Sequence, residues 1–137
     1  MWQVYAILSA IFAALTAIFA KIGVSNINSN LATAIRTLVI LFITWAIAFA
    51  TVPLRDIKDI SRQSLLFLIL SGLATGFSWL FYFKALQVGD ASKVAPVDKL
   101  SVVFTIILAF VLLGEPVSPK VIVGGLLILA GSLVLIF

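Results

Sequence analysis

Residues 31–52 read LATAIRTLVILFITWAIAFATV, an apolar run in which Arg36 is the one charged residue. A helix needs about 20 apolar residues to cross the roughly 30 Å hydrocarbon core of a bilayer, and this run is long enough. Four more runs meet that length on either side of it, so the predicted spans cover residues 2–22, 31–52, 65–86, 94–113 and 121–137. The sequence therefore predicts an all-α integral membrane protein, with five transmembrane helices in a single transmembrane domain over residues 1–137.

The composition fits lipid as the solvent. Hydrophobic residues make up 64% of the chain and charged residues 10%, against about a quarter charged in soluble domains. The net charge of +4 is scattered along the chain, so no basic run is present to bind a nucleic acid. The chain has no cysteine and no histidine, which excludes disulfides, thiol chemistry and a serine–histidine triad. We expect no enzyme, no cofactor, no metal site and no nucleic-acid partner.

Turn and cap residues separate the predicted spans. A polar turn precedes the second span, Pro53 ends it, and Gly114 to Pro116 ends the fourth. We expect N-caps at Asn30 for the second span, Asp59 or Ser61 for the third, Asp90 or Ser92 for the fourth, and Ser118, followed by Pro119, for the fifth. Because every link is short, consecutive helices should be antiparallel neighbours.

Polar side chains recur at helical spacing on four of the spans. In the third span they are Ser71, Thr75, Ser78 and Tyr82, with Trp79 beside them, and this stripe favours the wall of a cavity. Similar stripes are Tyr5, Ser9 and Thr16 in the first span, Thr33, Thr37 and Thr44 in the second, and Asp98, Ser101 and Thr105 in the fourth. The alternative is that each hydroxyl bonds a backbone carbonyl or a neighbouring helix.

Charged side chains within the spans are the strongest functional candidates, because burying them in lipid is costly unless they pair or face water. Arg36 and Lys99 lie about 8 Å inside their predicted spans at 1.5 Å per residue, and Asp98 is next to Lys99. An Arg36–Asp98 or Lys84–Asp98 pair is one hypothesis. The alternative is that long basic side chains extend to the headgroups, which we favour for Lys21 and Lys84.

The fifth span has a different character from the other four. It offers Ser132 as its polar side chain, and Gly124 and Gly131 lie seven residues apart on one face. Small residues let helix backbones approach closely in lipid. We therefore expect a dimer interface at Gly124 and Gly131, with ordinary packing inside the monomer as the alternative.

The loop charges are nearly balanced between the two sides of the membrane. Four basic residues lie on the side of the N-terminus, and three lie on the other side, with Arg36 and Lys99 just inside the bilayer. The positive-inside rule requires an imbalance to fix one orientation. Either the N-terminus lies weakly inside, or the chain inserts in both orientations and two copies pair antiparallel, building the inverted repeat that many transporters carry in one chain. We favour the second.

Several short motifs occur in a characteristic order along the chain. They include YAILSA at residues 5–10 and FAKIG at 19–23, SGLA at 71–74 and ALQVG at 85–89, ASKVAP at 91–96 and LGE at 113–115, and GLLILAG at 125–131. Together they resemble the EamA domain of the drug/metabolite transporter superfamily, in its small five-span bacterial and archaeal form. The resemblance implies half of a ten-helix inverted-repeat fold, transport of small metabolites (often amino acids) by alternating access, and a place in the cytoplasmic membrane as a multi-pass protein.

The related small multidrug-resistance proteins are antiparallel dimers that use a glutamate of the first helix for proton coupling. The first span here has no carboxylate, which argues against cation/proton antiport of that kind. The resemblance also suggests that Glu115 has a structural role in the loop before the fifth span.

The leading hypothesis is a small-metabolite transporter that works as a homodimer. Basic side chains would attract an anionic group such as a carboxylate, and Asp98 would pair with them or carry a proton. The predicted substrate-binding residues are Ser9, Thr16, Arg36, Ser71, Thr75, Ser78, Trp79, Tyr82, Lys84, Asp98 and Lys99. The alternatives are an accessory membrane subunit of a larger complex and a lipid-headgroup flippase subunit.

Overall fold

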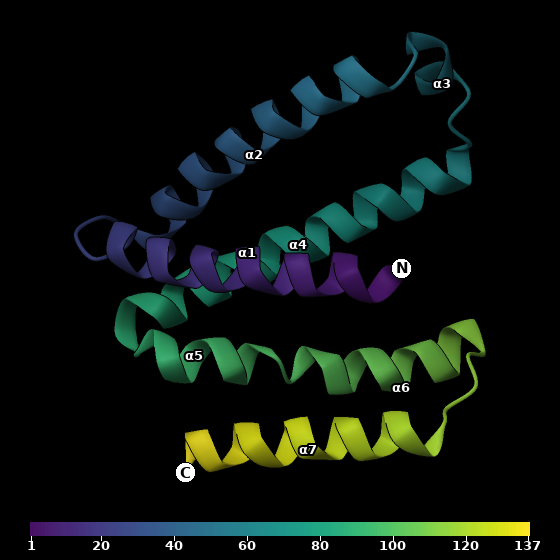
Figure 1. The fold of residues 1–137 in the computed structure, drawn as a ribbon. Coiled ribbons are helices and arrows are strands. Elements are labelled where there is room, and N and C mark those ends of the chain that lie inside the picture. The colour runs from purple at the N-terminus through teal and green to yellow at the C-terminus, as the bar shows by residue number, and fades with distance from the viewer. The chain divides into compact units, whose positions relative to one another are not determined.

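The computed structural model is a set of helices joined by short loops (Figure 1). Five helical segments are long and apolar enough to cross a membrane: α1 (Trp2–Gly23), α2 (Ser29–Thr51), α4 (Arg62–Val88), α5 (Ala91–Asp98) continued by α6 (Ser101–Leu113), and α7 (Pro119–Ile136). The structure describes residues 1–137, apart from the side chains of Leu54 and Ile57. The predicted all-α membrane protein with five spans is confirmed.

The contacts of the chain divide it into two compact units. One unit contains residues 1–18 and 88–137, and the other contains residues 19–87. That all 137 residues form a single transmembrane domain stays a prediction.

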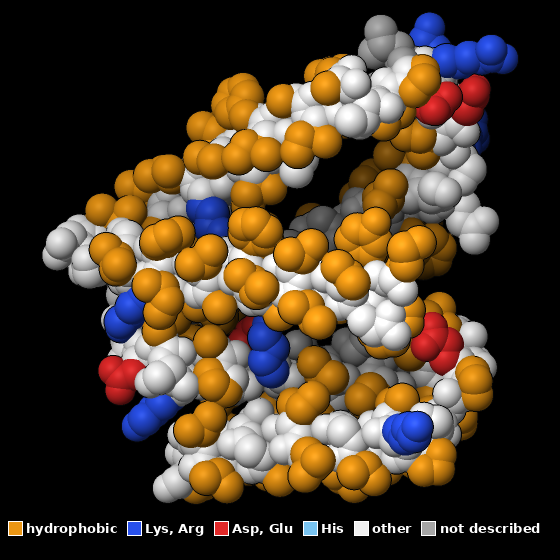
Figure 2. Space-filling view, in the orientation of Figure 1, with side chains coloured by type: hydrophobic (Ala, Val, Ile, Leu, Met, Phe, Trp, Pro, Cys, Tyr) orange, Lys and Arg blue, Asp and Glu red, His pale blue; other side chains and the backbone are white. Residues whose placement is uncertain are grey.

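Large apolar side chains are exposed along all five spans. Phe12, Phe42, Phe81 and Leu127, for example, are each exposed by more than half, and hydrophobic side chains cover much of the visible face in Figure 2. Exposed apolar surface of this extent is unfavourable in water. The helices are therefore built to be solvated by lipid, with their backbone polar groups bonded within each helix.

The ends of α2 and α4 depend on local caps. The prediction of Asn30 as the N-cap of α2 was wrong: Asn28 caps the helix, since its side chain accepts a hydrogen bond from the Asn30 backbone N–H at 2.8 Å. Of the two candidates before α4, Ser61 is the one whose side chain acts, because its Oγ accepts from the Ser64 backbone N–H at 3.0 Å. The short helix α3 (Leu54–Lys58) lies between α2 and α4 and was not predicted.

The fourth span is interrupted, where the sequence suggested one continuous helix. Pro96 lies inside α5 and has no N–H to donate to the preceding turn. The chain then passes through a tight turn of i to i+3 bonds, including Lys99 N to the Pro96 carbonyl and Val102 N to the Lys99 carbonyl, both at 3.0 Å. Such a stretch inside a helix often marks a hinge. With Ala91–Leu113 as one span, the turn lies within about 5 Å of its midpoint at 1.5 Å per residue.

The turn between α6 and α7 follows the predicted punctuation. Gly114 ends α6 with φ 65°, a left-handed conformation that favours glycine. The Glu115 backbone N–H donates to the Ala109 carbonyl at 3.2 Å and closes the helix end. Ser118 caps α7 and Pro119 occupies its first turn, which confirms the predicted cap.

Helix α7 packs along both α5 and α6 (Figure 1). Gly125 is buried, and the Ile106 Cδ1 atom lies 3.1 Å from the position that a Cβ atom on Gly125 would take. Two turns further along α7, the buried Ser132 hydroxyl donates to the Pro96 carbonyl at 3.1 Å. A glycine and a serine of α7 thus fix this helix against both halves of the interrupted span.

The core of residues 19–87 gathers around the α1–α2 turn and the C-terminal end of α4. Its buried apolar members are Ala20, Val24, Ala32, Phe83 and Leu86. By contrast, every residue of α4 from 62 to 78 is exposed. The close packing of this unit is therefore concentrated at one end of its helices.

Candidate functional site

Arg36 lies against aromatic rings inside the second unit. Its guanidinium carbon is 4.0 Å from the centre of the Trp79 ring and 5.4 Å from the centre of the Phe83 ring. Trp79 and Phe83 are one helical turn apart on α4, so both rings face the same neighbour. A guanidinium over aromatic faces is attracted by the ring quadrupoles, by about 0.5–2 kcal/mol depending on desolvation.

The guanidinium of Arg36 has no acidic partner among the side chains that the structure describes. Among those side chains, Lys99 and Asp98 form an ion pair with each other. Arg36 and Lys84 belong to residues 19–87 and Asp98 to the other unit, so an Arg36–Asp98 or Lys84–Asp98 pair stays a hypothesis. The Tyr82 ring packs edge-on to the Phe83 ring, with 6.5 Å between the ring centres.

Lys21 and Lys84 differ in their surroundings, although we expected both to extend to the headgroups. The Lys21 Nζ atom donates to the Leu86 carbonyl at 2.7 Å, near the C-terminal end of α4, where a cation is favoured by the helix dipole. Beside it, the Gln87 Nε2 atom donates to the Val24 and Ile27 carbonyls at 3.3 and 2.9 Å. Lys21 is therefore part of the joint between α1 and α4, whereas Lys84 is exposed and lies 3.5 Å from Gln87 Oε1.

Five threonines of the predicted stripes bond their own helices. Thr75 donates to the Ser71 carbonyl at 2.9 Å, and Thr33, Thr37, Thr44 and Thr105 make the same bond to the carbonyl four residues earlier. These bonds correspond to the alternative interpretation of the stripes, in which the hydroxyls bond backbone carbonyls. Ser9, Ser71 and Ser78 are exposed and Thr16 is half-buried.

Asp98 and Lys99 lie at the interruption of the fourth span. The Lys99 Nζ atom is 3.7 Å from Asp98 Oδ2, and the two side chains are 55% and 38% exposed respectively. Neighbouring residues of opposite charge cancel each other's net charge locally. This pair therefore attracts a charged ligand less than Arg36 does.

The glycines of α7 face two environments. A Cβ atom on Gly124 or Gly131 would meet nothing within 4 Å, whereas Gly125 is packed against Ile106. Within this unit, the space where a side chain would begin on Gly124 and Gly131 is thus open. Successive residues are about 100° apart around a helix, which explains how adjacent glycines differ so much.

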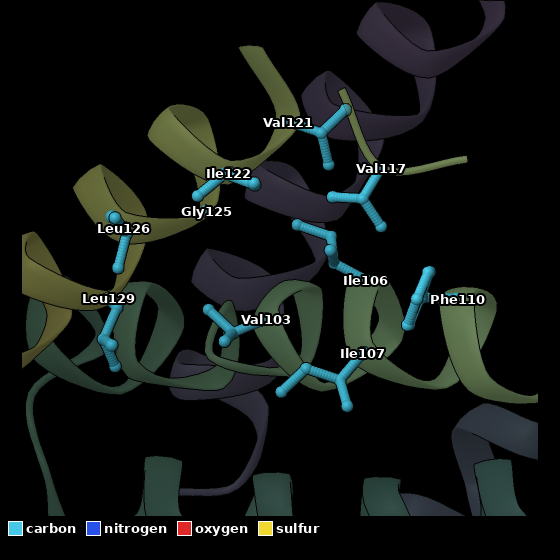
Figure 3. A pocket seen from close by; sticks show the side chains of 10 residues that line it. All are labelled: Val103, Ile106, Ile107, Phe110, Val117, Val121, Ile122, Gly125, Leu126 and Leu129. Carbon is cyan, nitrogen blue, oxygen red and sulfur yellow. The ribbon is translucent and has the colours of Figure 1, made fainter. Parts of the chain in front are cut away.

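The groove between α6 and α7 has a volume of about 280 Å³ (Figure 3). Its lining is entirely apolar: Val103, Ile106, Ile107, Phe110, Val117, Val121, Ile122, Gly125, Leu126 and Leu129. A small-molecule site needs a few placed polar groups to orient its ligand. This groove supplies none and suits hydrocarbon, so it is a poor candidate for the site of a polar substrate.

Three features of the candidate site were not predicted from the sequence. They are the contact of Phe83 with Arg36, the interruption of the fourth span after Pro96, and the hydrogen bond from Ser132 to the Pro96 carbonyl. Phe83 carried a signal, since it follows Trp79 by one helical turn. Pro96 carried one as well, because proline inside an apolar run predicts a kink. The partner of Ser132 is 36 residues away along the chain, so local pattern could not identify it.

Charged side chains within the spans of a protein with five membrane-spanning helices are typical of a membrane transporter. The comparisons agree with that class: the chain belongs to the EamA-like transporter family, whose model matches residues 1–137. It is 53% identical over 134 residues to a Sinorhizobium protein described as an uncharacterized transporter in the cobO 3′ region, and the match covers 98% of this chain and 95% of that protein. The comparison with solved structures found no match. Family and relative both identify a membrane transporter and not an enzyme.

Proposed function

We propose that this protein moves a small metabolite, with amino acids among the candidates, across the cytoplasmic membrane by alternating access, as an antiparallel homodimer. The observation that carries the proposal is the presence of charged side chains within two spans, Arg36 in α2 and the Asp98–Lys99 pair in the fourth. In a membrane helix such groups are retained where they serve a ligand or an ion.

The interrupted fourth span supports movement as part of the mechanism. Transporters commonly carry discontinuous helices near the middle of the bilayer, and the tight turn after Pro96 is of this kind. We propose that α5 and α6 change their relative angle at this turn during transport. Lys84, Ser71, Ser78, Ser9 and Thr16 remain candidates for contact with the substrate, each within its own unit.

The glycine face of α7 supports the dimer. Gly124 and Gly131 have open space where a side chain would begin, and close approach of helices in lipid requires such small residues. An odd number of spans in one chain also fits a partner of opposite orientation, because five helices make half of a ten-helix inverted repeat.

Flux into proteoliposomes tests the transport function. The purified protein is reconstituted, and uptake of radiolabelled amino acids and other small metabolites is compared with uptake into protein-free vesicles. We expect saturable uptake of at least one compound. Absence of uptake for the whole panel, together with co-purification of a different membrane protein, would favour an accessory subunit. Movement of a fluorescent lipid alone would favour a flippase.

Crosslinking of single cysteines tests the dimer, because the chain has no native cysteine. The midpoint of Pro119–Ile136 lies between Leu127 and Ile128, so Gly124 and Gly131 are equally far from it on opposite sides. In an antiparallel pair crossing at the midpoint, Gly124 of one copy faces Gly131 of the other. Mixing Gly124→Cys with Gly131→Cys protein should therefore give mixed crosslinks, whereas a parallel pair gives self-crosslinks.

Ala130→Cys is the matched control for this experiment. Ala130 is exposed, lies at nearly the depth of Gly131, and faces about 100° away from it around the helix. Equal crosslinking at Ala130 and Gly131 would contradict an interface on the glycine face.

A further inference from the structure

We infer that Arg36, held on Trp79 and Phe83, is the residue that recognises the substrate, and that the group it recognises is a carboxylate. The inference rests on the proposed transport function and specifies its substrate class. It starts from the contacts of Arg36 within residues 19–87, all of which belong to one compact unit.

The aromatic contacts use one part of the guanidinium and leave another part available. The group is planar, with its N–H bonds in the plane, and its central carbon lies over the Trp79 ring, 4.0 Å from the ring centre. None of the side chains or carbonyls that the structure describes accepts a hydrogen bond from Arg36. The donors along its edge are therefore left for a ligand.

The position of Arg36 makes unused donors costly. It lies roughly 10 Å into α2 from Ser29, at 1.5 Å per residue, and it is half-buried even without lipid around it. A buried cation without a counter-charge destabilises a protein unless something compensates it. Cation–π attraction offsets part of this cost, and an anionic ligand would offset the rest.

The charge and shape of the site favour a carboxylate over a phosphate. A guanidinium edge binds a carboxylate through two parallel hydrogen bonds, and this fork is the preferred geometry for a planar oxyanion. One arginine balances the single charge of a carboxylate, whereas a phosphate monoester carries about −1.5 to −2 at neutral pH. The ammonium of Lys84 lies 3.5 Å from Gln87 Oε1 and its side chain is exposed, so its charge adds little to the field at Arg36.

The test uses Trp79 itself as the reporter. The chain has three tryptophans, and the variant Trp2→Phe/Trp45→Phe leaves Trp79 as the sole one. Its fluorescence is titrated with isovalerate, benzoate and N-acetylleucine, each paired with its carboxamide, which keeps the shape and removes the charge. Inorganic phosphate and glycerol 3-phosphate are titrated in the same way for comparison. Glycerol 3-phosphate represents the headgroup of a phospholipid.

We expect at least one carboxylate to change the Trp79 fluorescence in a saturable way, and its carboxamide to bind more weakly by about tenfold or more, because hydrogen bonds to charged groups contribute roughly 1.5–3 kcal/mol. Arg36→Gln should abolish that preference. Arg36→Lys keeps the charge but not the fork, and should bind the carboxylate at an intermediate strength. Arg62→Gln, which removes an exposed arginine at the start of α4, should change nothing.

Three results would overturn the inference: equal binding of acid and carboxamide, a carboxylate preference that survives Arg36→Gln in correctly folded protein, or tighter binding of either phosphate than of every carboxylate. Gel filtration of each variant and the response of Arg36→Lys distinguish loss of the site from loss of the fold. Flux into proteoliposomes is measured separately. Uptake that is insensitive to Arg36→Gln refutes the inference and leaves the transport function intact, whereas carboxylate binding without any uptake refutes the transport function.

Discussion

Residues 88–137 and residues 19–87 both carry charged side chains inside membrane spans, but they compensate them differently. In the first region Asp98 has Lys99 as its neighbour, Ser132 bonds the Pro96 carbonyl, and Gly125 fits against Ile106. In the second, Arg36 lies on Trp79 with its N–H donors unused. The comparison teaches that a polar group bonded within its own region stabilises the fold, while one held only by ring faces is available to a ligand.

If that difference holds, the largest loss of stability should come from enlarging a packed glycine. Gly125→Leu forces a side chain into the space that Ile106 occupies, and overpacking of this kind costs about 1–3 kcal/mol. Gly72→Leu in α4 is the control, because a Cβ atom there meets nothing within 4 Å and the gain in helix propensity is the same. Thermal unfolding in detergent should separate the two variants, and equal midpoints would contradict the packing described for α7.

Trp79→Ala should weaken substrate binding, and it also removes the contact that offsets part of the cost of burying the Arg36 charge. Removing the ring loses about 0.5–2 kcal/mol of cation–π attraction, which corresponds to roughly 2- to 30-fold weaker apparent affinity for a transported carboxylate. Trp79→Phe should lose less.

Trp45→Ala is the matched control for Trp79→Ala. Trp45 packs on Phe49 at 5.1 Å in the same helix as Arg36. The measurement is the substrate concentration that gives half-maximal uptake. If this concentration is unchanged in Trp79→Ala, the Trp79 ring does not contribute to substrate binding.

A smaller effect is expected from the bond that fixes the interrupted span. Ser132→Ala leaves the Pro96 carbonyl without its hydroxyl donor, and hydrogen bonds between membrane helices contribute about 0.6 kcal/mol on average, with a maximum of about 1.7. Ser101→Ala, at an exposed serine of α6, should not change the unfolding midpoint. If both variants unfold together, the bond to Pro96 does not stabilise the protein.

The smallest effect should come from the Asp98–Lys99 pair, because exposed ion pairs contribute about 0–1 kcal/mol. Asp98→Asn and Lys99→Gln should each lower the unfolding midpoint slightly, and the double variant should lower it by less than the sum, since the second change removes an unpaired charge. Strict additivity would show that the two side chains act independently.

Much of the local structure was accessible from patterns along the chain. The Ser118–Pro119 start of α7 and the Gly114 end of α6 follow from cap chemistry that involves only neighbouring residues. The start of α2 was misplaced because both Asn28 and Asn30 have the chemistry of a cap, and only the hydrogen bond between them decides which residue acts. The interruption after Pro96 was missed because the segment as a whole is long and apolar enough for one span, although Asp98 and Lys99 lie at the turn.

The sequence alone determined that this protein is a five-span, all-helical membrane protein, because the length and apolarity of each span are properties of a contiguous segment. It also identified Arg36, Asp98 and Lys99 as charges in the membrane, and the order of its motifs indicated the EamA family. The tertiary structure alone decided their partners: aromatic rings for Arg36, the Pro96 carbonyl for Ser132, and Ile106 for Gly125. Each of these contacts joins residues from different helices, and spacing along one helix carries no information about which face of another helix it will meet.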